Sequence, residues 1–212
     1  MLSSHSLFRL SGLGLLAASL ISILGRVCDL IDGGKNSSLG VAGSAFLLLG
    51  SLLLVICLPA LFLRQVPRMG FSGLIGFLLF MFAALLLGIG GETMFLIISP
   101  WLASVAPHLA AQGPDSLGLF FLGSGVLELL GGVMFCIATL RAHVFPRWPI
   151  VLLLVIIIAQ AGLGMAQLNE LVSAVFDMLF YMTLAWVSIT LLMPGPLETA
   201  PQQEPIIRHV GV

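Results

Sequence analysis

The stretch F-S-G-L-I-G-F-L-L-F-M-F-A-A-L-L-L-G-I-G-G-E-T-M-F-L-I-I, residues 71–98, decides the fold. Glu92 is its single charged side chain, and apolar residues fill nearly all the rest. A helix needs about 20 such residues to cross ~30 Å of hydrocarbon. Backbone groups inside lipid must bond within their own segment, which a helix achieves. The stretch therefore predicts a transmembrane helix that carries a carboxyl group.

The composition of the whole chain points the same way. Of its 212 residues, 59% are hydrophobic and 8% are charged, and the mean hydropathy is +1.19. Soluble domains carry about 25% charged residues. Too few charges are present here to cover a surface that faces water. We therefore expect an all-α polytopic membrane protein.

Similar apolar runs predict a bundle of six transmembrane helices in a single domain, residues 1–193. Residues 194–212 contain four prolines and several polar side chains, which predicts a mobile cytoplasmic tail. The six predicted spans cover residues 7–26, 40–63, 71–98, 117–140, 149–167 and 171–193.

The basic residues predict the orientation of these spans. Cytoplasmic loops carry an excess of lysine and arginine. In a six-span arrangement, six arginines fall on one side, whereas only Arg26 and Lys35 fall on the other. Both termini are therefore expected in the cytoplasm. The six are Arg9, Arg64, Arg68, Arg141, Arg147 and Arg208.

Two stretches at the predicted cytoplasmic turns resemble known sequences. They are L-F-L-R-Q-V-P-R-M-G-F-S-G-L-I-G-F-L-L-F, residues 61–80, and C-I-A-T-L-R-A-H-V-F-P-R-W-P, residues 136–149. Both resemble turns in uncharacterised small multi-pass bacterial inner-membrane proteins. The resemblance implies a bacterial source and location in the inner (plasma) membrane. It implies no activity and no site residue.

Several kinds of chemistry find no support in the sequence. The net charge of −1 gives no reason to expect a nucleic-acid partner. The cysteines are odd in number and form no C-x-x-C pair, and the histidines fall in tails and loops. The letters L-G-S-G at 122–125 resemble the G-x-S-G of rhomboid proteases, but Leu122 replaces the first glycine and the last span has no histidine to act as the base. We expect neither a metal nor a cofactor.

Four polar side chains fall between the midplane and the outer leaflet of the predicted bundle: Glu92, Glu128, Gln160 and Asp177. No comparable group falls in the inner half. Each of the four shares a helix face with small or polar residues, spaced every four residues or by heptads. These faces carry Ala84, Gly88 and Glu92; Gly118, Gly125, Glu128 and Gly132; Gln160, Gly164 and Gln167; and Ser173, Asp177 and Tyr181.

The cost of charge in lipid favours turning these faces inward around a polar pocket. A carboxylate at mid-bilayer costs about 2.5–3.5 kcal/mol on insertion scales. The acids should therefore face one another, a cation or water. The pattern predicts ligand-binding or proton-coupling roles for Glu92, Glu128, Gln160, Asp177 and Tyr181. The glycines should let a neighbouring helix approach closely.

A purely structural interpretation stays open beside the functional one. Arg26 is placed at the outer end of the first span. It could form an ion pair with Asp29, Glu92 or Asp177, and the acids would then be halves of structural pairs. The connection at 98–116 could be an ordinary interface loop or a short interfacial helix over the mouth of the pocket.

Three classes of function therefore remain. The first is binding or transport of a small cation, or of an amphiphilic molecule with a cationic group. The second is a non-catalytic subunit that docks on a larger membrane complex, or a homodimer. The third is an enzyme inside the membrane, in which acidic side chains act on a lipid-like or isoprenoid substrate. The sequence favours the first class and carries no catalytic motif for the third.

Overall fold

The computed structural model describes residues 4–32, 37–112, 115–166 and 170–192, and nearly all of them are helical. No strand occurs among these residues, so the predicted all-α class is confirmed. The α-helices and the π-helical segments η1 and η2 are α1 (Ser4–Asp32), α2 (Ser38–Leu63), α3 (Val66–Ala83), η1 (Ala84–Gly91), η2 (Met94–Ile98), α4 (Ser99–Val105), α5 (Pro107–Gln112), α6 (Asp115–Ala142), α7 (Arg147–Ala166) and α8 (Glu170–Leu192).

Five of the described helical segments are long and apolar enough to cross a membrane. The third of these, Val66–Val105, is one helical segment that comprises α3, η1, η2 and α4. A shorter apolar helix, Arg147–Gly162, lies within α7. The lengths and hydropathies identify the protein as a helical bundle embedded in a membrane.

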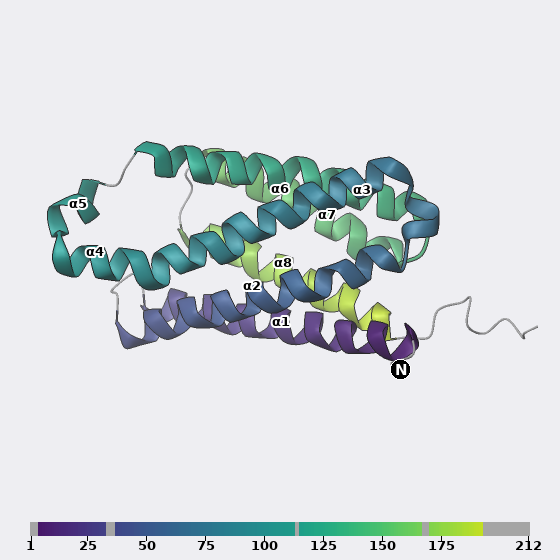
Figure 1. The fold of residues 1–212 in the computed structure, drawn as a ribbon, viewed down its shortest axis with the longest axis horizontal. Coiled ribbons are helices and arrows are strands. Elements are labelled where there is room, and N and C mark those ends of the chain that lie inside the picture. Colours follow the sequence, from purple (N-terminus) through teal and green to yellow (C-terminus); the bar gives the residue numbers. More distant parts are fainter. Residues whose placement is uncertain (1–3, 33–36, 113–114, 167–169, 193–212) are drawn as a thin grey trace, which may run out of the picture.

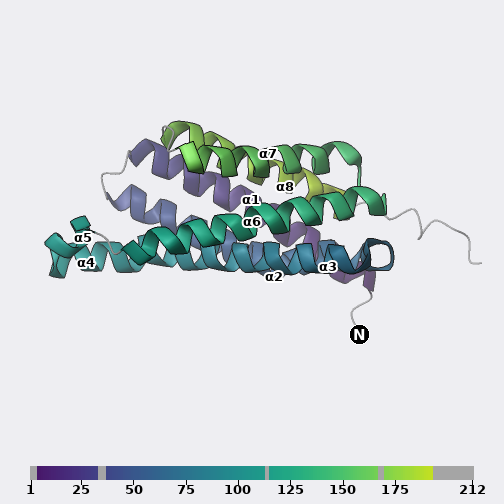
Figure 2. The same ribbon diagram turned by 90° about the horizontal axis from the view of Figure 1, so that it is seen from above.

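The long helices lie along one common axis and alternate in direction (Figure 1). They pack in a closed ring that follows the chain: α1 on α2, α2 on η1, α3 on α6, α6 on α7, α7 on α8, and α8 on α1. Figure 2 shows α7 and α8 on one side of the bundle and α2 and α3 on the other. The middle of this ring is enclosed by six helices.

The two ends of the bundle differ in charge. The α2–α3 and α6–α7 links lie at the same end (right in Figure 1), and we call this the basic end because Arg64, Arg68, Arg141 and Arg147 flank these links. The opposite end holds α4 and α5 (Figure 1), and we call it the α4–α5 end. Near the start of α3 the chain bends at Gly70, whose φ of 66° strains residues with a Cβ.

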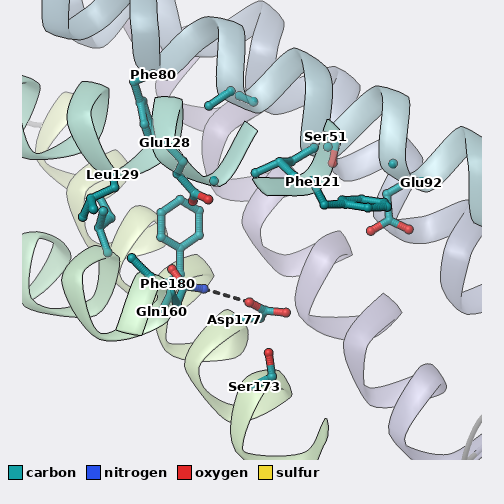
Figure 3. Close-up of a pocket in the computed structure, with 18 of the residues that line it drawn as sticks. Ser51, Phe80, Glu92, Phe121, Glu128, Leu129, Gln160, Ser173, Asp177 and Phe180 are labelled. Carbon is teal, nitrogen blue, oxygen red and sulfur yellow. Dashed lines mark hydrogen bonds between the residues drawn. The ribbon is translucent and has the colours of Figure 1, made fainter. Parts of the chain in front are cut away.

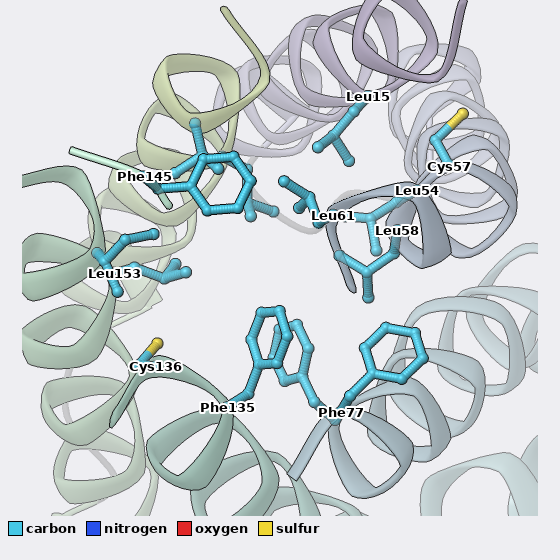
Figure 4. Packing of buried hydrophobic residues seen from close by; sticks show 14 of the residues in the cluster. Leu15, Leu54, Cys57, Leu58, Leu61, Phe77, Phe135, Cys136, Phe145 and Leu153 are labelled. Carbon is cyan, nitrogen blue, oxygen red and sulfur yellow. The ribbon is translucent and has the colours of Figure 1, made fainter. Parts of the chain in front are cut away.

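Apolar side chains fill the ring in its basic half. The cluster draws on all six long helices, α8 included through Leu184, Val187 and Leu191. Figure 4 shows part of it converging on the axis of the bundle, with Leu15, Leu58, Phe77, Phe135 and Leu153 among the side chains labelled. Lipid is as apolar as these side chains, so their contact is not stabilised by removal from water. Close packing between the helices stabilises it instead. The rings of Phe80 and Phe135 stack with their centroids 6.1 Å apart.

Glycines bring α3 and α6 into close contact in this half. A Cβ on Gly76 would lie 2.7 Å from Phe135 N, and one on Gly131 would lie 2.4 Å from Phe80 N. The expected close approach at Gly118 and Gly125 is wrong, because a Cβ there would meet nothing within 4 Å. The two helices thus pack tightly towards the basic end and leave open space beside the outer glycines of α6.

Candidate ligand-binding site

A cavity of about 680 Å³ occupies the middle of the ring in the half nearer the α4–α5 end. Six helices contribute side chains to its wall, including Arg26 from α1, Ser51 from α2, Glu128 from α6, Gln160 from α7 and Asp177 from α8. Figure 3 shows carboxylates of α6 and α8 and of the η1–η2 junction at its edges, with phenylalanine rings between them. The cavity is therefore both acidic and aromatic.

Arg26 is the centre of the charged groups. Its Nε lies 3.0 Å from Asp177 Oδ2, its Nη1 lies 3.4 Å from Asp29 Oδ2, and its Nη2 lies 3.8 Å from Glu92 Oε1. The α1 helix continues to Asp32, so Arg26 lies inside that helix and not at its end. One guanidinium thus joins α1 to α8 and to the junction of η1 and η2.

Gln160 extends this network to α7. Its Nε2 donates a hydrogen bond of 2.7 Å to Asp177 Oδ1, drawn as the dashed line in Figure 3. Its Oε1 is buried and has no hydrogen-bond partner within the described part of the chain. Asp177 therefore accepts a hydrogen bond from Gln160 at Oδ1, while Arg26 neutralises its charge at Oδ2. Gln160 keeps an acceptor available inside the protein.

Glu128 stands apart from the network. It lines the cavity from α6, opposite Asp177 (Figure 3). In the part of the chain that the structure describes, it has no hydrogen bond and no ion pair. Asp177, the acid on the opposite wall of the cavity, carries charge of the same sign. Glu128 is thus a carboxyl group presented to the cavity without a compensating cation.

Glu92 lies where the helix changes its hydrogen-bonding pattern. The segments before and after it, η1 and η2, are π-helical, which sequence reasoning missed. The run G-I-G-G, residues 88–91, contains three glycines, whose backbone is conformationally freer than that of other residues. A Cβ on Gly88 would lie 2.9 Å from the Ser51 side chain, so α2 packs close here. The wider turn sets Glu92 beside Arg26.

Apolar side chains border the cavity where it reaches the outside of the bundle. Phe95 and Phe121 stack with ring centroids 6.1 Å apart, linking η2 to α6. Phe95, Leu122 and Val126 line the cavity and are also exposed on the outside of the protein. The mouth of the cavity is therefore rimmed by side chains suited to lipid.

The structure brings every candidate residue from the sequence to one place. Glu92, Glu128, Gln160, Asp177 and Tyr181 all line the cavity, and so does Arg26. Asp29 reaches the same network through Arg26. Gly164 and Gln167 lie outside the residues whose side chains are described. Sequence reasoning missed the aromatic residues of the wall, since nothing in their spacing separates them from lipid-facing positions.

Two further polar side chains correct the expectation for the other half of the bundle. Gln65 and Thr139 are buried near the basic end, where no group comparable to Gln160 was expected. Gln65 lies in a link of two residues between α2 and α3, too short to leave the bundle. A position that the sequence places at the membrane surface is therefore inside the protein.

The described residues contain no group of three or more histidine, cysteine, aspartate or glutamate side chains that could hold a metal ion. Comparisons with protein-family models, curated proteins and solved structures found no match.

Proposed function

We propose that the protein binds an amphiphilic organic cation in this cavity. The observation that carries the proposal is the imbalance of charge. Three carboxyl groups and one guanidinium line the cavity, and Asp29 adds a fourth acid to the network of that guanidinium. Unpaired charge at this depth is costly and marks functional sites. A bound cation would offset the surplus.

The position of Glu128 indicates where the cationic group would lie. Arg26 is shared among Asp29, Glu92 and Asp177, whereas Glu128 has no such partner in the described residues. The cationic group would sit between Glu128 and Asp177, within reach of the unpartnered Oε1 of Gln160. The rings of Phe121 and Phe180 line the same space and can contribute cation–π attraction.

The size and rim of the cavity favour an organic molecule with an apolar part. Small-molecule sites measure about 300–1,000 Å³, and this cavity falls within that range. A bare ion would leave most of this volume empty. The exposed apolar rim at Phe95, Leu122 and Val126 supports entry from the lipid phase. An amine or guanidinium attached to an apolar body meets these requirements.

We also infer that the bundle crosses the membrane six times with both termini in the cytoplasm. The α7 helix has 20 residues and closes the ring between α6 and α8, antiparallel to both and along the same axis, which supports a sixth crossing. The arginines at the basic end support its placement in the cytoplasm. The mouth of the cavity then lies in the outer half of the membrane. A bacterial inner membrane is the proposed location.

The test uses ethidium, a fluorescent aromatic cation, as the probe. Purified protein in mild detergent should bind it saturably, as followed by fluorescence. Glu128→Gln should weaken the binding about tenfold, which corresponds to ~1.4 kcal/mol for one lost charge interaction. The substitution conserves shape and breaks no hydrogen bond or ion pair seen in the described residues.

Asp32→Asn is the matched control. Asp32 is an acid at the same end of the bundle, accepts a hydrogen bond from Ser37, and does not line the cavity. Its substitution should leave ethidium affinity within about twofold of the wild type. Equal weakening by both variants would show that only the overall charge matters. Absence of saturable binding to the wild type would refute the proposal.

A further inference from the structure

The side chain of Gln65 is buried at the basic end of the bundle. The residue is 0% exposed, and among the described residues neither Oε1 nor Nε2 has a hydrogen-bond partner. An amide side chain offers two donors and an acceptor. Buried polar groups are normally satisfied, so each exception requires an explanation.

Thr139 on α6 shows the same anomaly beside it. Thr139 is 2% exposed, and its Oγ1 has no hydrogen-bond partner among the residues that the structure describes. Both side chains line one small pocket of about 10 Å³, which we call the basic-end pocket. A cavity of about 10–15 Å³ with several polar neighbours can hold one water molecule. Apart from Gln65 and Thr139 the lining of this pocket is apolar, and its volume corresponds to a single water molecule.

Phe80 separates the basic-end pocket from the large cavity. Among the described residues, it alone lines both spaces. Its ring centroid lies 6.4 Å from that of Phe180, which lines the large cavity, and 6.1 Å from that of Phe135, which lines the basic-end pocket. Movement of this side chain would join the two spaces along the axis of the ring.

We propose that the large cavity and the basic-end pocket are two parts of one transmembrane path, closed at Phe80 in this conformation. The protein would then carry the amphiphilic cation across the membrane down its gradient, and not only bind it. This inference rests on the proposed binding function. The oxygens of Gln65 and Thr139 would replace water around the cationic group as it passes.

Arg64 makes the basic-end pocket a point of passage rather than a second binding site. Its Nη1 donates a 2.9 Å hydrogen bond to Thr190 O, and its Cζ lies 5.9 Å from the centroid of Phe145, which lines the pocket. A fixed positive charge there repels a cation that rests beside it. The acidic cavity therefore holds the ligand, and the basic end favours its release.

The test is ethidium influx into proteoliposomes that contain DNA, whose complex with ethidium fluoresces. Wild-type protein should give saturable influx above that of protein-free liposomes. Gln65→Leu should slow influx at least threefold while ethidium affinity in detergent stays within twofold, because Gln65 does not line the large cavity. Phe80→Ala should raise the influx rate at least threefold by removing the closure.

Phe82→Ala is the matched control, since Phe82 lies two residues away on α3 and is exposed on the outside of the bundle. It should leave influx unchanged. Phe80→Trp gives the opposite test if Phe80→Ala fails to fold, and it should slow influx. Binding to the wild type without influx above protein-free liposomes would overturn the path and leave the binding proposal standing. The proposed path would also be overturned if neither Gln65→Leu nor whichever Phe80 variant folds changed the rate of influx.

Discussion

Arg26 has two opposing effects, one on stability and one on binding. Its guanidinium holds α1, α8 and the η1–η2 junction together through Asp177 and Glu92. It also cancels part of the negative charge that would attract a cationic ligand. Because the side chain is only partly exposed, water does not screen these interactions fully. Stability and affinity should therefore respond to this residue in opposite directions.

Arg26→Gln should lower the free energy of unfolding by about 2–3 kcal/mol, since it leaves several acids without their cation. Partial exposure keeps the loss at the lower end of the range for buried pairs. Ethidium affinity should rise at the same time. Thermal unfolding and fluorescence titration measure the two effects, with Arg68→Gln on the exposed surface as the control.

Removing one of the unpaired acids provides the complementary measurement. The double variant Arg26→Gln, Asp177→Asn should recover part of the lost stability, because one fewer carboxylate then lacks a cation. If Arg26→Gln melts at the wild-type temperature, the ion pairs do not hold the helices together. If the double variant melts lower than the single one, the pairwise explanation is wrong.

Individual helices show which sequence patterns were informative. Spacing by four placed Ser173, Asp177 and Tyr181 on one face, and all three line the cavity. The same spacing could not reveal the π-helical segments η1 and η2, because such segments are rare and interrupt helices that are otherwise α-helical. Nor could it separate Gly131, which packs against α3, from Gly125, which borders open space. Tertiary packing decides these cases.

Gly131→Ala should lower the melting temperature sharply. Its new Cβ would lie 2.4 Å from Phe80 N and 2.7 Å from Leu79 C, both backbone atoms that can move only if α3 moves. Overpacking of this kind costs about 1–3 kcal/mol. Circular dichroism during heating would measure the change in melting temperature.

Gly123→Ala is the control on the same helix, because a Cβ there would meet nothing within 4 Å. It should leave the melting temperature unchanged or raise it slightly, since alanine has a higher helix propensity than glycine. Equal destabilisation by both variants would indicate a general effect of glycine replacement. Equal tolerance would mean that α3 and α6 are not held at this contact.

For the whole molecule, composition and apolar runs were sufficient to predict an all-helical membrane bundle, because lipid permits few alternatives. The depth of the charged residues was also enough to suggest one polar region. The burial of Gln65 in its short link could not be predicted in this way, since hydropathy places a polar residue between two spans at the membrane surface. Only the packing of the ring shows that this amide lies inside.

The number of crossings follows from the sides on which the helix ends lie. Cysteine would be introduced in turn at exposed Ser104 in α4, Pro146 in the α6–α7 link and Ser173 in α8, after replacement of Cys28, Cys57 and Cys136. An impermeant maleimide should label Ser104→Cys and Ser173→Cys in intact bacterial cells that express the protein. Pro146→Cys should react only after the cells are permeabilised if the basic end faces the cytoplasm, as we propose.

The comparison between Pro146→Cys and Ser173→Cys tests α7 itself, because α7 lies between the two positions in the chain. If the two cysteines are labelled from opposite sides of the membrane, α7 crosses it and the ring has six transmembrane helices. The same side would mean that α7 does not span, and the path along the ring axis would then lack one of its walls. Protection of Ser173→Cys by ethidium would further connect the outer accessible surface to the cavity, which Ser173 lines.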